Sequence, residues 1–377
     1  MATPTEQQTG KPRRRRVGRL FQTIVAATCT AGILAVGAPA AGADPVTADR
    51  SGAARALDAS QFKGVNWADP RDNFVTGPVV PTGLSTADSY STVYLKAWRI
   101  LHEFRSDTGA NTVRLPVNPY SVGTAWWKSY RAVVDAATRS GFKVILSYWE
   151  GSDAAKDGKV DDPAAWSTMW NTLTNTYKKN NRVYFEPMNE PFGYSGSDWV
   201  SLVTTWVTTY AQQGIPRDRM FVSGTGYNDH VNAVCKIAAL DGTYVSQHFY
   251  GYWATHTYAG WVADFSKRLG DQSCSQRTVL DEFGSPMTNG FDYRASATAS
   301  DPDTNNYVAY LQATTDTVRT RHMGAVYWPG LRAGDSYSLE TLTGWGTHLH
   351  LVVNDPTGVD LLRWAWGYGH RLPHPKY

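Results

Sequence analysis

The chain has 377 residues, 18% of them charged and 13% aromatic, with 36 Lys and Arg against 33 Asp and Glu. Residues 1–43 hold six of the basic residues and one of the acidic ones, so residues 44–377 carry 30 basic and 32 acidic residues. This near-neutral remainder excludes the concentrated positive charge with which proteins bind nucleic acids or anionic membranes.

The first 43 residues have the pattern of a bacterial-type secretory signal. A basic stretch from Lys11 to Arg19 precedes a small-residue and apolar stretch, Ile24 to Ala38, and Ala41-Gly42-Ala43 forms an A-x-A cleavage site. The apolar stretch is short for a membrane-spanning helix of about 20 residues. We therefore expect a secreted protein, without stable membrane association after cleavage, whose mature part is residues 44–377. The sequence leaves the Sec and twin-arginine routes open.

Short apolar runs alternate with helical patterns along the mature part. The runs are rich in Val, Ile, Tyr and Phe and end at polar, aromatic, Gly or Pro residues, which is typical of strands. We expect strands at Phe62–Trp67, Thr112–Pro116, Lys143–Tyr148, Arg182–Phe185, Met220–Ser223, Tyr244–His248, Thr278–Asp281 and Gly324–Trp328. We expect helices at 92–109, 126–141, 162–180, 197–214 and 301–321, and a closing helix near Val359–Trp366. Eight strands separated by helices predict an α/β fold, a single (β/α)8 TIM barrel, with its chemistry at the carboxyl ends of the strands.

Two glutamates stand at the expected ends of two different strands. Glu190 follows the fourth strand in Asn189-Glu190-Pro191, and Glu282 follows the seventh in TVLDEFGSP. Retaining glycoside hydrolysis needs such a pair of carboxyl groups, one as general acid/base and one as nucleophile. Asp281 stands next to Glu282, but neighbouring strand residues point to opposite faces, so we expect only one of them in the pocket. Taken alone, each motif also fits an ordinary turn.

The residues at the strand ends resemble those of glycoside hydrolase family 5, which consists of retaining (β/α)8-barrel glycosidases. The resemblance covers about residues 61–330 and rests on GVNW at 64–67, Arg114 in NTVRLPV, Asn189-Glu190-Pro191, His248-Phe249-Tyr250, Glu282 in LDEFG and Trp328 in VYWPG. It implies that Glu190 is the acid/base and Glu282 the nucleophile. It implies substrate-binding or supporting roles for the remaining matched residues.

Elementary chemistry is consistent with these supporting roles. Arg114 stays charged and would hold the nucleophile ionised. Tyr250 would donate a hydrogen bond to the nucleophile, and His248 would bond the substrate or the acid/base. Asn189 would donate a hydrogen bond to the substrate, and Trp328 would form the floor of the subsite or pack at the top of the barrel. Two carboxyl groups and a water molecule complete the reaction, so we expect no cofactor and no metal.

The third strand departs from the family pattern. It reads VILSYWEG, and Trp149 stands where many members of the family have a His. A bulky ring there would stack on sugar or narrow the subsite, which favours an atypical subgroup with a pocket rather than an open groove. Glu150 is a further carboxylate at this strand end, and we interpret it as a substrate contact or a structural acid.

The cysteines predict one disulfide. Cys29 lies in the expected signal, which leaves Cys235 and Cys274 as an even pair in an exported protein. Two buried free thiols are the alternative interpretation.

The leading hypothesis is a secreted retaining β-glycosidase that hydrolyses a plant or microbial β-linked polysaccharide or oligosaccharide by double displacement. An exo-acting glycosidase or transglycosylase on small glycosides is the alternative. Trp149 favours it, as does the long insert Ala68–Ser91, which would wall off one end of a cleft. A non-catalytic carbohydrate-binding barrel is the third hypothesis. We expect a monomer with a carbohydrate substrate and no nucleic acid partner; the sequence does not identify the sugar.

Overall fold

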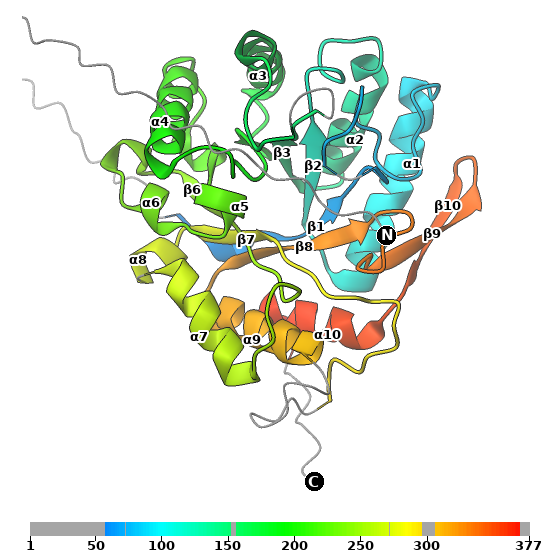
Figure 1. Cartoon of the computed structure of the whole chain (residues 1–377). Helices are drawn as coiled ribbons and strands as arrows, with labels where there is room; N and C mark the ends of the chain where they lie inside the picture. Colours follow the sequence, from blue (N-terminus) through cyan, green and yellow to red (C-terminus); the bar gives the residue numbers. More distant parts are fainter. Residues whose placement is uncertain (1–56, 72, 152–155, 271, 296–305, 370–377) are drawn as a thin grey trace, which may run out of the picture. The chain divides into compact units, whose positions relative to one another are not determined.

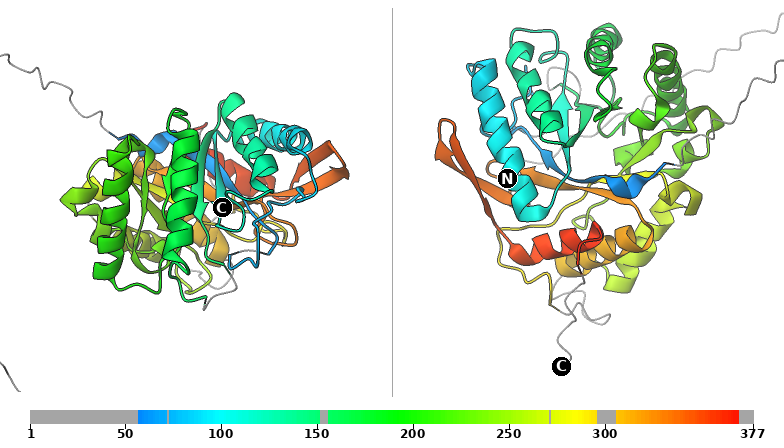
Figure 2. Two further views of the ribbon diagram at one scale, coloured as in Figure 1. Left: turned by 90° about the horizontal axis from the view of Figure 1, so that it is seen from above. Right: turned by 180° about the vertical axis from the view of Figure 1, so that it is seen from behind.

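Eight parallel strands form a single sheet in the computed structural model, which describes residues 57–71, 73–151, 156–270, 272–295 and 306–369. The order of the strands is β4-β3-β2-β1-β8-β7-β6-β5. A parallel bridge between Phe185 and Met220 brings the two edges of this sheet together. The result is a nearly closed barrel with helices on its outer side, as Figure 1 and the two further views of Figure 2 show. The predicted (β/α)8 barrel is confirmed, whereas the expected signal at residues 1–43 lies outside the described residues.

The strands of the barrel agree closely with the predicted ones. They are β1 (Lys63–Trp67), β2 (Thr112–Val117), β3 (Lys143–Tyr148), β4 (Val183–Glu186), β5 (Phe221–Ser223), β6 (Tyr244–His248), β7 (Thr278–Glu282) and β8 (Gly324–Leu331). All of their residues are buried except Lys63 and Lys143, which are half-buried. This is the pattern of parallel strands that have side chains packed inside the barrel and helices outside it.

The helices occupy the connections between the strands. The longer ones are α1 (Tyr90–Glu103), α2 (Trp127–Arg139), α3 (Pro163–Tyr177), α4 (Gly196–Gln212), α7 (Tyr258–Leu269), α9 (Asn306–Thr320) and α10 (Pro356–Ala365). The short ones are α5 (Thr225–Asn228), α6 (Asn232–Cys235), α8 (Gln272–Ser275), the 3-10 turns η1 (Ala59–Gln61), η3 (Arg217–Arg219) and η4 (Ala238–Leu240), and the π-helical η2 (Phe104–Thr108). At the start of α3, the Asp162 side chain accepts two backbone N–H bonds and Pro163 follows it, which is a common way for a helix to begin. The sequence analysis missed α7.

The interior of the barrel changes from apolar to polar along its axis. At the amino-terminal ends of the strands an apolar cluster fills it: Ala59, Phe62, Ile145, Tyr184, Phe221, Tyr244, Val279 and Val326. Two residues further along their strands come the buried polar side chains of Ser147, Glu186, Ser246 and Asp281. Because inward-facing residues recur every second position, the polar layer lies directly above the apolar one and supports the carboxyl ends of the strands.

Two elements outside the barrel complete the fold. An antiparallel hairpin, β9 (Glu340–Trp345) and β10 (His348–Val353), lies beside α1 (Figure 1). Exposed histidines alternate with buried leucines along β10. Cys235 and Cys274 form the predicted disulfide, with 5.6 Å between their Cα atoms. Across the described ranges, no helix has both the length and the apolar character needed to span a membrane.

Candidate active site

A pocket of about 460 Å³ lies at the carboxyl ends of the strands. Six of the sequence-predicted site residues line it: Trp149, Asn189, Glu190, Tyr250, Glu282 and Trp328. The other two, Arg114 and His248, are buried and contact the lining residues through hydrogen bonds. Asn73 and Phe74, from the insert Ala68–Ser91 that the sequence analysis expected to wall off one end of the cleft, complete the walls together with Tyr252, Asp335 and Tyr337.

Glu190 and Glu282 approach each other across this pocket. Glu190 Oε1 lies 2.9 Å from His248 Nδ1, and Glu282 Oε2 lies 3.6 Å from His248 Nε2. One oxygen of each carboxyl group lies within 4.8 Å of the other. The Glu190 side chain is 20% exposed and that of Glu282 is 9% exposed. Two largely buried carboxyl groups at this separation can hold one proton and one negative charge between them, so that one is a proton donor while the other is ionised.

The backbone at Glu190 is strained. Its φ is 49°, in the left-handed region that a non-glycine residue adopts at a cost of roughly 1–3 kcal/mol. Hydrogen bonds on both sides hold this conformation, because the N–H of Asn189 donates to the carbonyl of Tyr148 and the N–H of Phe192 donates to that of Glu190, each at 2.8 Å. Strain of this kind is common where a side chain is held for function.

Arg114 on β2 is the centre of the buried polar layer. Its guanidinium donates to Glu186 at 2.7 and 2.9 Å, and also to Asn189 (2.7 Å), Asn66 (3.1 Å), Ser147 (3.1 Å) and Glu282 (3.1 Å). Burial disfavours its charge, but Glu186, Asp281 and Glu282 outweigh burial and raise the pKa of Arg114. Arg114 therefore remains a cation and directs one N–H to the carboxylate of Glu282.

Sequence reasoning missed Glu186, the last residue of β4. It is fully buried, and its two oxygens accept two N–H groups of Arg114 in the paired geometry that strengthens such contacts. The signal was present in the sequence, because Glu186 stands two positions after the inward-facing Tyr184. A charged residue at such a position requires a buried partner.

The predicted alternation of Asp281 and Glu282 does not hold. The pairing of β6 with β7 shifts register between Gln247 and His248, so His248 pairs with Glu282 and Asp281 is an extra residue. As a result, both carboxyl groups approach Arg114, at 3.7 Å for Asp281 and 3.1 Å for Glu282. Of the two, Glu282 lines the pocket. Asp281 is fully buried, and burial together with Glu186 raises its pKa well above the ordinary range, which favours its neutral form.

Opposing effects act on Glu282. Burial raises the pKa of its carboxyl group. The Arg114 guanidinium and the Tyr250 hydroxyl, which donates to Glu282 Oε1 at 2.7 Å, act in the opposite direction because both stabilise the carboxylate. These two contacts are the ones that the sequence analysis expected for a nucleophile.

Two tryptophans form an apolar wall of the pocket. The rings of Trp149 and Trp328 lie 5.4 Å apart at an angle of 49°, and they pack with Ala68 and Tyr250. Flat aromatic surfaces of this kind suit the C–H face of a sugar ring. Trp149, the departure from the family pattern, thus belongs to the pocket.

Glu150 does not line the pocket. Its carboxylate accepts the backbone N–H groups of Asp157 and Gly158 at 2.9 and 2.8 Å, and burial raises its pKa to about 7. Of the two interpretations left open by the sequence, this geometry matches a structural acid.

Two sets of three side chains in the described ranges bring potential metal-ligand atoms within 4.8 Å of one another: Glu186, His248 and Asp281, and Glu190, His248 and Glu282. Each set contains a carboxylate that already accepts a hydrogen bond from Arg114. The guanidinium of Arg114 therefore supplies positive charge to both sets.

The family profile named Cellulase (glycosyl hydrolase family 5) matches residues 75–330. The chain belongs to glycosyl hydrolase family 5. It is therefore a glycoside hydrolase, as the sequence analysis predicted. The family match covers β2 to β7 and β8 as far as Gly330, together with the loop residues Glu190 and Tyr250.

Two curated endoglucanases are similar to parts of this family 5 chain. Endoglucanase H of Acetivibrio thermocellus is 26% identical over 165 residues, which are 40% of this chain and 18% of that protein. Manganese dependent endoglucanase Eg5A of Phanerodontia chrysosporium is 30% identical over 119 residues, 28% of this chain and 29% of that protein. Each match spans less than a third of the relative's length.

Solved structures of endoglucanases share the fold. The catalytic domain of the major endoglucanase from Xanthomonas campestris pv. campestris has a TM-score of 0.58 at 16% identity, covering 81% of this chain and 94% of that one. Cel5A (EG2) from Hypocrea jecorina has a TM-score of 0.54 at 16% identity, covering 81% and 98%. At such low identity the likeness concerns the barrel and not the substrate.

Proposed function

We propose that this family 5 enzyme is a secreted retaining β-glycosidase that cleaves a β-linked glucan, with Glu190 as acid/base and Glu282 as nucleophile. The observation that carries the proposal is the approach of the two carboxyl groups within one pocket, with an oxygen of each within 4.8 Å of the other. Retaining enzymes hold the pair about 5–5.5 Å apart, whereas inverting enzymes need about 6.5–9.5 Å to admit a water molecule between them. The short separation supports retention.

The reaction would proceed in two displacements. In the first, Glu282 attacks the anomeric carbon, the glycosidic C–O bond breaks and Glu190 gives its proton to the leaving oxygen. In the second, Glu190 takes a proton from water, the water oxygen bonds to the anomeric carbon and the bond to Glu282 breaks. Arg114 and Tyr250 would stabilise the carboxylate of Glu282 before the first step and after the second.

A glucan is the favoured substrate for two reasons. The curated relatives that match parts of the chain are named endoglucanases. The pocket also combines the Trp149 and Trp328 rings with the amide of Asn189, which matches the alternating apolar faces and hydroxyl groups of a neutral sugar chain.

An exo-acting or transglycosylating enzyme is the second candidate. Asn73 and Phe74 from the long β1–α1 connection line the pocket, as do Asp335 and Tyr337 from the β8–β9 connection. These two connections contact each other, since Ala333 N–H donates to Thr82 Oγ1 at 3.0 Å. Walls of this kind favour a pocket that holds a chain end over an open groove.

A hydrolysis screen across β-linked polysaccharides and aryl β-glycosides tests both candidates. We expect cleavage of a β-glucan. Proton NMR should show that the β-anomer of the product is released first. Release of the α-anomer would contradict the retaining mechanism, and a lack of hydrolysis on all these substrates would contradict the proposed function. Products of random internal cleavage would show that the enzyme acts in the endo mode. A single short product released from the chain end would show that it acts in the exo mode.

Export is a further part of the proposal, and the pattern of residues 1–43 supports it. Expression of the full chain in a bacterial host, followed by amino-terminal sequencing of secreted protein, should find Asp44 as the first residue. Retention of the uncleaved chain inside the cell would contradict export.

A further inference from the structure

His248 lies between the two carboxyl groups of the site. The ring nitrogen that carries the proton determines which carboxyl group receives a hydrogen bond from His248. Its Nδ1 lies 2.9 Å from Glu190 Oε1, while its Nε2 lies 3.3 Å from the side-chain nitrogen of Asn228. The ring is fully buried, and burial lowers its pKa to about 4, so at neutral pH it carries one ring proton. The placement of this proton on Nδ1 or on Nε2 sets the hydrogen bond that Glu190 receives.

The orientation of the Asn228 amide follows from a contact other than His248. Ser246 Oγ lies 2.7 Å from Asn228 Nδ2, 2.7 Å from Asp281 Oδ1 and 3.1 Å from Glu186 Oε1. A hydroxyl group has a single hydrogen to donate. A carboxyl oxygen takes that hydrogen here, so Ser246 Oγ accepts from Asn228. The same amide nitrogen therefore directs its second hydrogen to His248 Nε2.

Asn228 is held rigidly in this place. It is fully buried and ends the short helix α5. Its φ is 55°, in the left-handed region that Asn adopts more readily than other non-glycine residues. The residue type suits this backbone conformation, and the contact with Ser246 sets the orientation of the amide.

We propose that Asn228 is a positioning residue that fixes the tautomer of His248 and thereby the proton of the acid/base. An amide N–H that donates to Nε2 requires Nε2 to be without hydrogen, so the ring proton lies on Nδ1 and is donated to Glu190 Oε1. The acid proton of Glu190 must then lie on Oε2, from which it is given to the leaving oxygen. The inference deepens the proposed function and rests on the role of Glu190 in it.

The proton would otherwise have a competing position. Nε2 also lies 3.6 Å from Glu282 Oε2 and 3.7 Å from Asp281 Oδ1, and both oxygens attract a hydrogen. A proton on Nε2 would leave Nδ1 as an acceptor. Nδ1 would then accept a hydrogen bond from the acid proton of Glu190, and that proton would not be directed at the leaving oxygen. The charged or titratable groups that act on the ring are Glu190, Glu282, Asp281, Arg114, Glu186 and Asp229. By donating to Nε2, the Asn228 amide keeps the ring proton on Nδ1.

The Asn228→Asp variant tests this placement, because it keeps the shape and tolerates the left-handed backbone but replaces the donor by an acceptor. We expect the ring proton to move to Nε2, which nitrogen-15 NMR of labelled histidine detects, with His248→Gln to assign the signal. Glu190 loses a donor that favours its ionised form, so the basic limb of the kcat/KM profile should move up by about one pH unit. We expect kcat/KM at the optimum to fall roughly a hundredfold, within the range that general acid–base catalysis contributes.

Two further variants make the test decisive. Asn228→Gly removes the amide without backbone strain and should move the basic limb in the same direction, even if Asn228→Asp does not fold. Asn171→Asp adds the same charge on the exposed side of α3 and should leave the profile unchanged. A proton on Nε2 in the unmodified protein, or an unchanged basic limb in both folded Asn228 variants, would overturn the proposal. An unmodified enzyme without glycosidase activity would refute the proposed function instead, and the NMR measurement would still decide the role of Asn228.

Discussion

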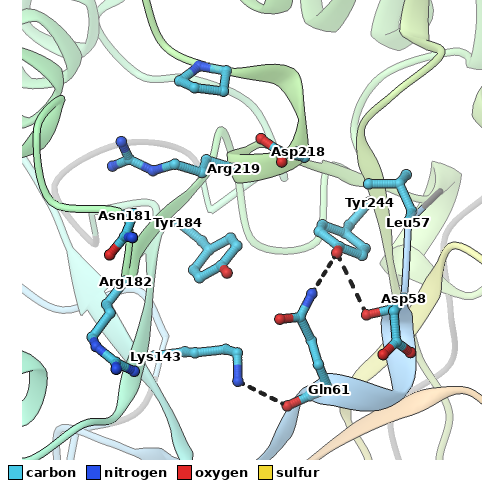
Figure 3. A pocket seen from close by; sticks show the side chains of 11 residues that line it. Leu57, Asp58, Gln61, Lys143, Asn181, Arg182, Tyr184, Asp218, Arg219 and Tyr244 are labelled. Carbon is cyan, nitrogen blue, oxygen red and sulfur yellow. Dashed lines mark hydrogen bonds between the residues drawn. The ribbon is translucent and has the colours of Figure 1, made fainter. Parts of the chain in front are cut away.

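The two ends of the barrel hold cavities of similar volume that are built in different ways. The cavity at the carboxyl ends of the strands measures about 460 Å³, and the one at the amino-terminal ends measures about 410 Å³. Figure 3 shows the second cavity, with Lys143, Arg182, Arg219 and Tyr244 around it. We call the two the upper and the lower cavity.

The basic groups of the lower cavity are bonded to the main chain. Arg219 donates to the carbonyl groups of Val183, Lys178 and Tyr177 at 2.7 to 2.8 Å. Lys143 donates to the carbonyl of Gln61 at 3.1 Å, as Figure 3 shows. Backbone carbonyl groups do not ionise. These contacts therefore hold the backbone in place, and no proton can be transferred between the partners.

The upper cavity differs because its charged groups are bonded to one another. Arg114 donates to side-chain oxygens, among them carboxylate oxygens of Glu186 and Glu282. A network of titratable groups stores charge and passes protons, and the carboxyl ends of barrel strands are where enzymes of this fold place their chemistry. Cavity volume alone therefore does not distinguish a site from a structural void.

The largest difference between the cavities should appear when a carboxylate is removed. Glu282→Ala and Glu190→Ala should each lower activity on a β-glucan at least about a thousandfold, because nucleophile and acid/base are lost. Glu190→Ala should lose less on an aryl glycoside whose leaving group needs no proton. Steady-state kinetics and circular dichroism would check both.

Asp218→Ala, at the lower cavity, is the matched control and should retain full activity. A folded Glu282→Ala enzyme with normal turnover would refute the assignment of the nucleophile.

Two arginine substitutions compare the cavities in a second way. Arg114→Lys keeps the charge but loses the paired contact with Glu186, so kcat/KM should fall roughly a hundredfold and the free energy of unfolding by about 3 kcal/mol. Arg219→Lys should lower only the free energy of unfolding, since its partners are carbonyl groups. Denaturant unfolding and kinetics on both variants separate the two effects, and an equal loss of kcat/KM in both would contradict the comparison.

The pH dependence gives a smaller effect. Tyr250 donates to Glu282 and stabilises its ionised form, so Tyr250→Phe should raise the pKa of Glu282 further. The nucleophile must be ionised, and activity is lost as pH falls through its pKa. The acid limb of the kcat/KM profile should therefore move up by about one pH unit. An acid limb that stays in place would show that Tyr250 does not act through Glu282.

The smallest effect is expected for the matching tyrosine of the lower cavity. Tyr244 accepts a hydrogen bond from Gln61 Nε2 at 2.6 Å, and its hydroxyl lies 3.4 Å from the carbonyl of Asp58 (Figure 3). Tyr244→Phe should cost about 1 kcal/mol in thermal unfolding experiments and leave the pH profile as it is. A shifted profile would link the lower cavity to catalysis.

Most of the fold and the residues lining the pocket were predictable from the sequence. Strand runs ended at polar or aromatic residues, and those ends supplied six of the lining residues, Glu190 and Trp328 among them. The network below the pocket was not predictable to the same extent. Asp281 enters it through an irregular pairing of β6 and β7, and Asn228 enters it from a short helix with no periodic pattern.

The sequence by itself determined the barrel, the disulfide and the family, because hydrophobic periodicity, cysteine number and strand-end residues are local properties of the chain. The tertiary structure decided which carboxyl groups meet at Arg114 and which ring nitrogen of His248 faces Glu190. These relations depend on the register between strands and on contacts between residues far apart in the chain, such as the 168 positions that separate Arg114 from Glu282. Register is set by the packing of the whole barrel, so no single segment of the sequence contains it.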